Sequence, residues 1–163
     1  MEIYILRHGV AAERGTPGYK KDSDRPLTKE GEDKMHQIAE AILGMELKFD
    51  LILSSPYIRA AQTAQIVANE LDEEVTFTDA LIPDGNPLDL IAEINDEKPQ
   101  RLLLVGHEPD LSRLASVLIT GGSDAVIELK KGGLCKLTSD KLTFGQCATL
   151  NWLLTPRLLR SLR

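Results

Sequence analysis

The stretch Glu2-Ile3-Tyr4-Ile5-Leu6-Arg7-His8-Gly9 decides the fold. Residues 2–6 are apolar or favour β-structure almost without a polar break, which is typical of a strand buried on both faces. Arg7 and His8 end this run abruptly, and Gly9 permits a sharp change of direction. Open α/β sheets bind ligands beyond the carboxyl ends of their strands, so these two residues stand where a functional site is expected. Taken alone, they are equally compatible with the start of a solvated loop.

Size and composition indicate one globular α/β domain spanning residues 1–163. The chain is 42% hydrophobic and 27% charged, as is ordinary for a soluble protein. Its 19 basic and 25 acidic residues give a formal net charge of −6, which does not indicate a nucleic-acid-binding surface. An acidic protein that binds an anion needs a local cluster of cations, and Arg7 is the first candidate for one.

The sequence favours a cytoplasmic protein that binds no membrane. No apolar run approaches the length of a membrane span, and the N-terminus enters a strand rather than a signal peptide. Cys135 and Cys147 lack metal-ligand spacing, and we expect buried free thiols; a disulfide between strands is the less favoured alternative. The sequence carries no signal for an oligomeric state.

A polar, turn-rich loop runs from residue 10 to Pro26, and a helix follows it. Thr28 is the predicted N-cap, and the acidic residues at 30 and 32 suit the positive end of the helix dipole. His36 lies off the apolar face of this helix and is expected to face solvent. The predicted inward positions are Met35, Ile38, Ala39, Ile42 and Leu43.

Two further buried strands, Phe49–Leu53 and Arg101–Val105, also end in polar residues. After the first, Ser55 is the predicted cap of a helix that carries Pro56 and Arg59 in its first turn. After the second come His107, Glu108 and Pro109, and the proline is expected in the first turn of another helix. The connection between these elements, residues 72–100, holds a short strand and a small helix and is too short for a lid domain.

The last third of the chain has a different pattern. Val126–Leu129 and Leu134–Leu137 flank Lys-Lys-Gly-Gly, which predicts a β-hairpin, and Ala148–Leu154 predicts a further strand. Arginines at 157, 160 and 163 are interpreted as the solvated end of a helix, where cations suit the negative pole of the dipole.

These elements predict a three-layer α/β/α sandwich with a mostly parallel central sheet. The carboxyl ends of parallel strands share one edge, so Arg7, His8, Arg59 and His107 are expected to line one crevice. Guanidinium and imidazole groups beside helix N-termini are suited to a tetrahedral dianion such as phosphate.

A metal site is the alternative use of His8 and His107. Glu108 or Asp110 would then be further ligands. Arg7 would repel a divalent cation, however, and no HxxxH or HxH spacing is present. We therefore expect no bound metal.

Four motifs in this order resemble the histidine phosphatase superfamily: Leu6-Arg7-His8-Gly9, Arg25-Pro26-Leu27-Thr28, Arg59-Ala60-Ala61-Gln62-Thr63 and Gly106-His107. The short chain and the RPLT motif are most similar to its phosphohistidine phosphatase (SixA) branch. The resemblance implies a phosphoglycerate-mutase-like fold and no cofactor. It further implies that His8 is the nucleophile of a phosphohistidine intermediate. Arg7 and Arg59 would clamp the phosphoryl oxygens, and His107 would stabilise the transition state.

One departure from the family concerns the proton donor. Many members carry Glu or Asp directly after RHG and a later acid, whereas Val10 follows Gly9 here. Asp84, Asp79 and Glu108 are the alternatives for that acid, and Asp84 is equally well explained as a turn residue in Pro-Asp-Gly. Asp84 is also a candidate substrate contact.

Arg25 is a second candidate substrate contact, with an equal alternative. It either reaches the rim of the site and binds substrate, or braces its own loop through Asp22 or Asp24.

The lack of a clear proton donor for the leaving group indicates which substrate class to expect. An alkyl phosphate leaves as a strongly basic alkoxide and needs an acid, whereas a protonated phosphohistidine leaves as neutral imidazole, whose pKa is about 6.5. We therefore expect phosphohistidine on a protein as the substrate. The alternatives are a small phosphate ester, a mutase reaction, and a phosphate-binding module without chemistry.

Overall fold

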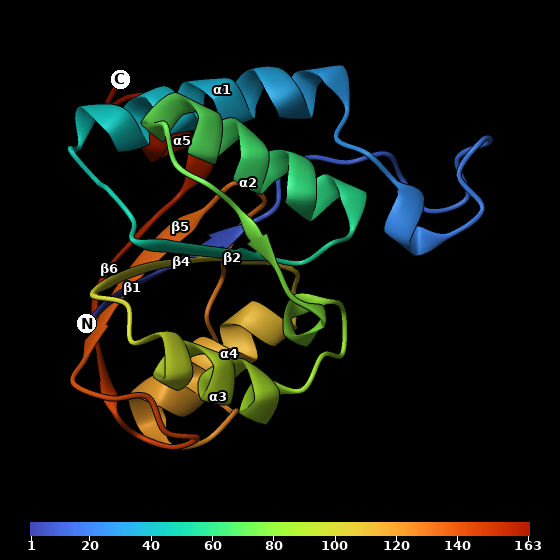
Figure 1. Ribbon diagram of the computed structural model, residues 1–163. Helices are drawn as coiled ribbons and strands as arrows, with labels where there is room; N and C mark the ends of the chain where they lie inside the picture. The colour runs from blue at the N-terminus through green and yellow to red at the C-terminus, as the bar shows by residue number, and fades with distance from the viewer.

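The computed structural model describes residues 1–163 as a three-layer α/β/α sandwich around one six-stranded sheet (Figure 1). The order across the sheet is β3-β2-β4-β1-β5-β6. β1 to β4 are parallel, whereas β5 is antiparallel to both of its neighbours, β1 and β6. The predicted fold class is therefore confirmed. The strands are β1 (Glu2–Arg7), β2 (Leu51–Ser54), β3 (Thr76–Phe77), β4 (Arg101–Gly106), β5 (Leu134–Ser139) and β6 (Ala148–Leu154).

Helices cover both faces of this sheet (Figure 1). One face carries α1 (Lys29–Gly44), α2 (Ile58–Leu71) and the short α5 (Pro156–Arg160). The other face carries α3 (Pro87–Glu97) and α4 (Asp110–Thr120). Two 3-10 turns, η1 (Asp22–Asp24) and η2 (Asp79–Leu81), lie in the loops that follow β1 and β3. Every helix is too short or too polar to span a membrane.

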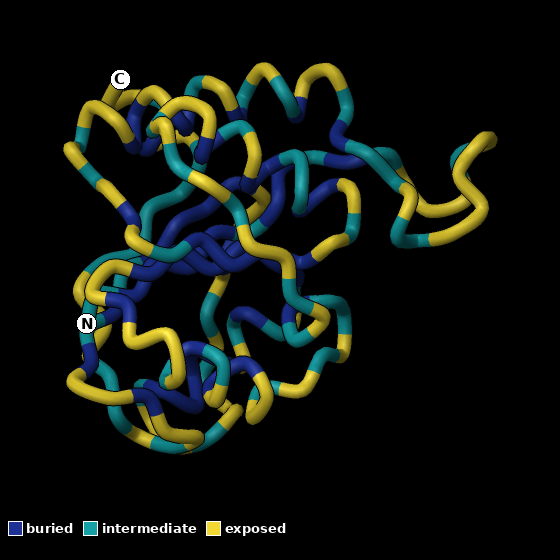
Figure 2. The backbone as a smooth tube through the Cα atoms, in the orientation of Figure 1, coloured by how far each residue is buried: buried dark blue, intermediate teal, exposed yellow.

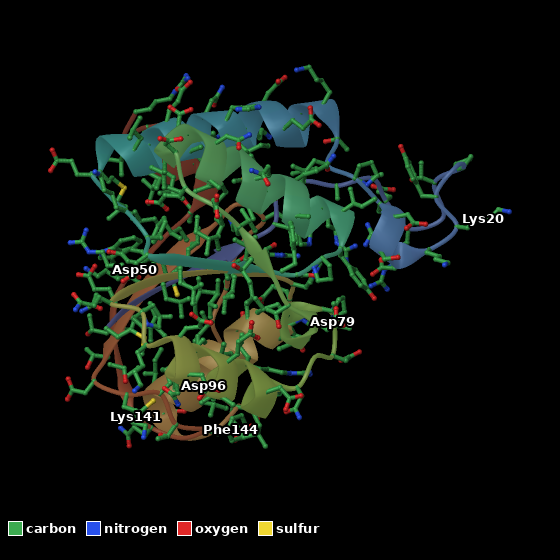
Figure 3. All side chains as sticks on the ribbon, in the orientation of Figure 1. Lys20, Asp50, Asp79, Asp96, Lys141 and Phe144 are labelled. Atoms are coloured by element: carbon green, nitrogen blue, oxygen red, sulfur yellow. The ribbon has the colours of Figure 1, made fainter.

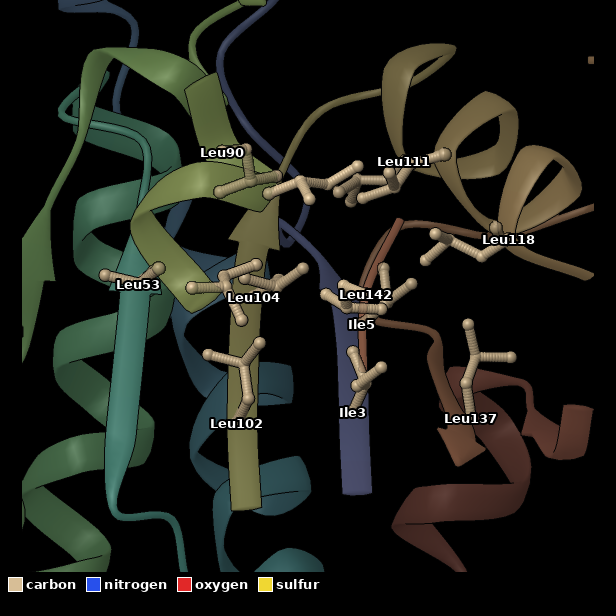
Figure 4. Close-up of a cluster of buried hydrophobic side chains, with 14 of the residues drawn as sticks. Ile3, Ile5, Leu53, Leu90, Leu102, Leu104, Leu111, Leu118, Leu137 and Leu142 are labelled. Atoms are coloured by element: carbon tan, nitrogen blue, oxygen red, sulfur yellow. The ribbon is translucent and has the colours of Figure 1, made fainter. Parts of the chain in front are cut away.

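The alternating side chains of β1 divide the hydrophobic core into two halves. Ile3 and Ile5 belong to the cluster beneath α3 and α4 (Figure 4), and Tyr4 and Leu6 belong to the cluster beneath α1 and α2. All four side chains are at most 1% exposed, and Figure 2 shows the middle of the sheet as a buried band. A strand covered on both faces tolerates polar side chains only at its ends, which explains why Arg7 marks the rim of the sheet.

Helix starts agree with the predictions only in part. Thr28 caps α1 as predicted, because its hydroxyl accepts the N–H of Gly31 at 3.0 Å. Helix α2 begins after Tyr57 rather than at Ser55, and Pro109 caps α4 instead of lying in its first turn. Leu43 was predicted inward but is 46% exposed, because it lies in the last turn of α1, beyond the core.

The predicted hairpin of residues 126–137 is wrong. Residues 124–130 form no strand, and β5 pairs with β1 on one side and β6 on the other. β4 occupies one edge of β1, and β5 pairs with the other. In this pairing Leu6 lies opposite Leu134 and Glu2 lies opposite Thr138. The hairpin in this region is therefore β5–β6, which contains the predicted strand at 148–154.

Both cysteines are free thiols, as predicted. Cys135 is buried in β5, and burial raises its pKa to about 12, so this thiol stays protonated. Cys147 is only half-buried, which differs from the prediction of two buried thiols.

Candidate active site

The carboxyl ends of β2, β4 and β1 are neighbours at one edge of the sheet. Arg7 stands opposite Gly106 in the β1–β4 ladder, and the N–H of His8 donates to the Gly106 carbonyl at 3.2 Å. This register places the rings of His8 and His107 with their centroids 5.2 Å apart. The structure thus brings together the two histidines that the sequence places after separate strands.

His8 is a buried, neutral imidazole with one nitrogen committed. Its Nδ1 lies 2.7 Å from the carbonyl oxygen of Gly9, which can only accept, so we assign the ring proton to Nδ1. Burial is the largest cause that lowers the pKa of His8 to about 3, and the charges of Arg59 and Arg7 act in the same direction. Nε2 therefore carries a lone pair at neutral pH, as a nucleophile requires.

The hydroxyl of Ser55, which was predicted only as a helix cap, holds His107. Its Nε2 lies 2.8 Å from Oγ of Ser55, and the same oxygen accepts the N–H of Tyr57 at 3.2 Å. We assign the Ser55 hydroxyl as the donor to Nε2, so that the ring proton of His107 lies on Nδ1. Burial, followed by the charge of Arg59, lowers the pKa of His107 to about 3, so this ring is also neutral.

Arg59 is 3% exposed and is paired with Asp22 of η1. One terminal nitrogen donates to the Asp22 carbonyl at 2.8 Å and the other to its Oδ2 at 3.0 Å. Burial alone would raise the pKa of Asp22, but hydrogen bonds from Arg25 and Arg59 hold it below its ordinary value. This carboxylate therefore stays ionised and fixes Arg59 near His107.

Arg25 braces the loop that carries Asp22. Its Nε and one terminal nitrogen donate to Oδ1 of Asp22 at 2.9 and 2.6 Å, and the other terminal nitrogen donates to the Ala12 carbonyl at 2.5 Å. Its side chain is 13% exposed. Of the two alternatives for Arg25, the geometry matches the brace, and it does so through Asp22 rather than Asp24.

Arg7 completes the cluster, with one terminal nitrogen donating to the Leu129 carbonyl at 3.0 Å. Burial lowers its pKa, although the group remains a cation at neutral pH. Four buried side-chain atoms in the protein lack a hydrogen-bond partner, and three of them are Nε of Arg7, Nε of Arg59 and Nδ1 of His107. Buried donors without a partner are rare, and three at one site are typical of a pocket whose acceptor is an anionic ligand.

The polar residues that follow Arg59 fasten the loop after β1. The hydroxyl of Thr63 accepts the N–H of Gly9 at 3.0 Å and donates to the Arg59 carbonyl at 2.8 Å. Oε1 of Gln62 accepts the N–H of Leu27 at 2.7 Å. Gln62 and Thr63 were not among the site residues predicted from the sequence. Their spacing of three and four residues from Arg59 places them near the same face of a helix, which was the signal available.

A cavity of about 310 Å³ adjoins the histidine pair and is lined by both His107 and Asp84. Its walls are mostly apolar, including Leu81, Leu111 and Phe144. The Asp84 side chain is exposed, and its backbone N–H donates to Asp110 at 2.7 Å. His107 lines this cavity whereas His8 does not, so the cavity lies on the His107 side of the histidine pair.

The two other acid candidates lie elsewhere. Asp79 is exposed in η2, where Figure 3 labels it, and does not line the cavity at His107. The Glu108 carboxylate accepts the N–H of Ser112 at 2.9 Å and also contacts the Ser112 hydroxyl. It is thus engaged in the first turn of α4.

Comparisons with known proteins agree with this geometry. The family model described as histidine phosphatase superfamily (branch 1) matches residues 3–83. An uncharacterized protein of Picosynechococcus is 38% identical over 143 residues, covering 85% of this chain and 86% of the relative. The phosphohistidine phosphatase SixA of Escherichia coli is 27% identical over 162 residues, covering 96% and 94%. A solved structure of the protein histidine phosphatase SixA complexed with tungstate superimposes with a TM-score of 0.80 at 27% identity, covering 96% and 98%.

Proposed function

The chain belongs to branch 1 of the histidine phosphatase superfamily, and on this premise we propose that it hydrolyses phosphohistidine on a protein. The observation that carries the proposal is the state of His8. Its ring is neutral, its Nδ1 proton is held by Gly9, and its Nε2 makes no hydrogen bond within the protein. A nucleophile in this state lies beside two guanidinium groups whose Nε atoms have no partner.

The proposed reaction has two steps. In the first, Nε2 of His8 attacks phosphorus, the bond between phosphorus and the substrate imidazole breaks, and that imidazole leaves neutral if its distal nitrogen already carries a proton. In the second, water attacks phosphorus and the bond to Nε2 breaks, which releases inorganic phosphate and restores His8. Arg7 and Arg59 neutralise the phosphoryl oxygens, and Nδ1–H of His107 donates to developing charge. Tungstate, a tetrahedral oxyanion, is the ligand in the SixA neighbour, which supports phosphoryl recognition by this fold.

The leaving group favours phosphohistidine over alkyl phosphates. Of the three acid candidates, Asp84 is the one that lines the cavity at His107, and its side chain is exposed. Neutral imidazole needs no proton donor at the moment of cleavage, whereas an alkoxide does. The name of the Escherichia coli relative, a phosphohistidine phosphatase, supports the same substrate class. We assign Asp84 a contact with the leaving group, and Arg25 a positioning role through Asp22.

A small phosphate ester is the second candidate substrate. The apolar cavity of about 310 Å³ favours it, because such a volume accommodates a small organic group. Turnover of a phosphohistidine peptide, an aryl phosphate and glycerol phosphate separates the two proposals. We expect the peptide to have the highest kcat/KM and glycerol phosphate the lowest; efficient hydrolysis of glycerol phosphate would contradict the proposal.

The intermediate gives an independent test. After rapid mixing with substrate and quenching in alkali, mass spectrometry should locate a phosphoryl group on His8. The His8→Ala variant should show neither this adduct nor turnover. Turnover by His8→Ala at the rate of the natural protein would exclude the mechanism, and phosphate binding without turnover by the natural protein would indicate a binding module.

A further inference from the structure

A second cavity, of about 370 Å³, lies between α1, α5 and the turn that precedes β5. Twelve residues line it, and none of them is acidic. Five are cations: Arg7, Lys34, Lys130, Lys131 and Arg160. We call this site the basic cavity. It concentrates positive charge in a chain whose net charge is −6, so its composition differs from that of the rest of the molecule.

Most of these cations have no internal counter-ion. Lys130, Lys131 and Arg160 form no ion pair within the protein, and Lys130 and Lys131 are exposed. Lys34 pairs with Glu30, which also interacts with the charge of Arg160, and Glu108 interacts with the charge of Arg7. Two carboxylates, Glu30 and Glu108, against five cations still leave a positive excess, which attracts acidic groups at low ionic strength.

The basic cavity is attached to the phosphoryl site through the backbone. The N–H of Gly132 lies 3.0 Å from the Arg7 carbonyl and 3.2 Å from the His8 carbonyl. The guanidinium of Arg7 donates to Leu129, the residue before Lys130. The turn that presents the lysines is therefore held against Arg7, the last residue of β1, and His8, which follows it, and Arg7 belongs to both sites.

We propose that the basic cavity binds acidic side chains of the phosphorylated protein whose phosphohistidine occupies the site at His8. This inference rests on the proposed function. A ligand that reaches both sites must extend past the end of β1, which a simple phosphate ester does not do. The cations come from β1, α1, α5 and the turn before β5, so they suit several carboxylates spread over a surface better than one compact anion.

Two synthetic phosphohistidine peptides test the proposal. They are identical except that one carries several Glu residues on both sides of the phosphohistidine and the other carries Gln at those positions. At low salt we expect the natural protein to have a KM for the Glu peptide about tenfold lower than for the Gln peptide. The difference should vanish at about 0.3 M salt. In Lys130→Glu/Lys131→Glu the two peptides should have equal KM values, while kcat/KM for an aryl phosphate changes less than about twofold.

The matched control is Lys98→Glu/Lys141→Glu, which makes the same change of charge in a cavity beside Glu2 and Arg101, at the amino ends of the strands. Figure 3 shows Lys141 on the opposite side of the molecule from Lys20 and Asp79. This control should keep the preference for the Glu peptide. A preference that survives in the Lys130→Glu/Lys131→Glu variant would overturn the proposal, as would an equal loss of aryl phosphatase activity.

Two further outcomes are distinct. If the natural protein hydrolyses the aryl phosphate but neither peptide, the proposed function fails, and the docking proposal fails with it. If inorganic tripolyphosphate binds the natural protein but not the lysine variant in calorimetry, while the peptides show equal KM values, the basic cavity is a site for a small polyanion and protein docking is excluded.

Discussion

Oγ of Ser55 lies 2.8 Å from Nε2 of His107, and both residues are buried at the ends of neighbouring strands. The same oxygen accepts the N–H of Tyr57, and we assign the Ser55 hydroxyl proton to the bond with His107, which places the ring proton of that histidine on Nδ1. On this assignment we infer that Ser55 positions the ring of His107.

Replacing Ser55 by Ala should lower kcat by about tenfold and leave KM nearly unchanged, because a misoriented donor weakens transition-state stabilisation more than binding. Nitrogen NMR of the imidazole should show the Nδ1–H tautomer of His107 in the natural protein and a mixture in the variant. Ser54→Ala is the matched control, since Ser54 is equally buried but donates only to the Ser55 carbonyl. Equal kcat losses in both variants would indicate a packing effect instead.

Asp22→Ala should lower kcat/KM by about tenfold or more, because Arg59 and Arg25 lose the carboxylate that orients them. Steady-state kinetics with an aryl phosphate measures this loss. Asp24→Ala is the control: Asp24 lies two residues away in the same 3-10 turn, and its carboxylate accepts a hydrogen bond from Ser23 but from neither arginine. Unchanged activity in Asp22→Ala would show that Arg59 is held well enough by the backbone carbonyl at position 22.

Asp84→Asn should separate substrates by leaving group. Phenyl phosphate, which leaves as a basic phenolate, should lose about tenfold or more in kcat/KM if Asp84 donates a proton. A phosphohistidine peptide and p-nitrophenyl phosphate should change less than about twofold, because their leaving groups need no acid. Equal losses for all three substrates would assign Asp84 to general substrate binding.

The free energy of unfolding should fall as the pH decreases from about 6.5, the ordinary pKa of histidine, towards 3. His8 and His107 have pKa values lowered to about 3 in the folded state, so below pH 6.5 the unfolded chain binds protons that the folded chain does not. Each contributes a slope of up to about 1.4 kcal/mol per pH unit. Urea unfolding between pH 7.5 and 4 measures this slope, which should be shallower in His8→Asn. An equal slope in that variant would mean that His8 is not buried in its neutral form.

The sequence could predict the site residues that lie at the carboxyl ends of single buried strands. Three apolar runs stop at Arg7, Ser54 and Gly106, and a parallel sheet brings such ends together whatever the details of packing. Gly31 is a different case. A Cβ there would lie 2.0 Å from the Val10 carbonyl oxygen, so the glycine permits α1 to begin against the loop, and only the structure shows this contact.

The contacts that sequence could not predict join residues far apart in the chain. Asp22 and Arg59 are 37 residues apart and meet only because η1 folds over the start of α2. The pairing of β5 with β1 likewise depends on which strand edge is open, and an alternating pattern carries no information about partners. The expected hairpin at 126–137 failed for this reason.

In the turn at residues 130–133 the backbone and the side chains have different roles. Its amide and carbonyl groups hold the end of β1 through Arg7 and His8, whereas the side chains of Lys130 and Lys131 face outward and hold nothing. Substitutions at these two positions can therefore reverse the local charge while the backbone hydrogen bonds to Arg7 and His8 stay in place. If the proposed docking holds, a change of charge at these two positions alters which protein surfaces suit the basic cavity and leaves the groups around His8 unchanged.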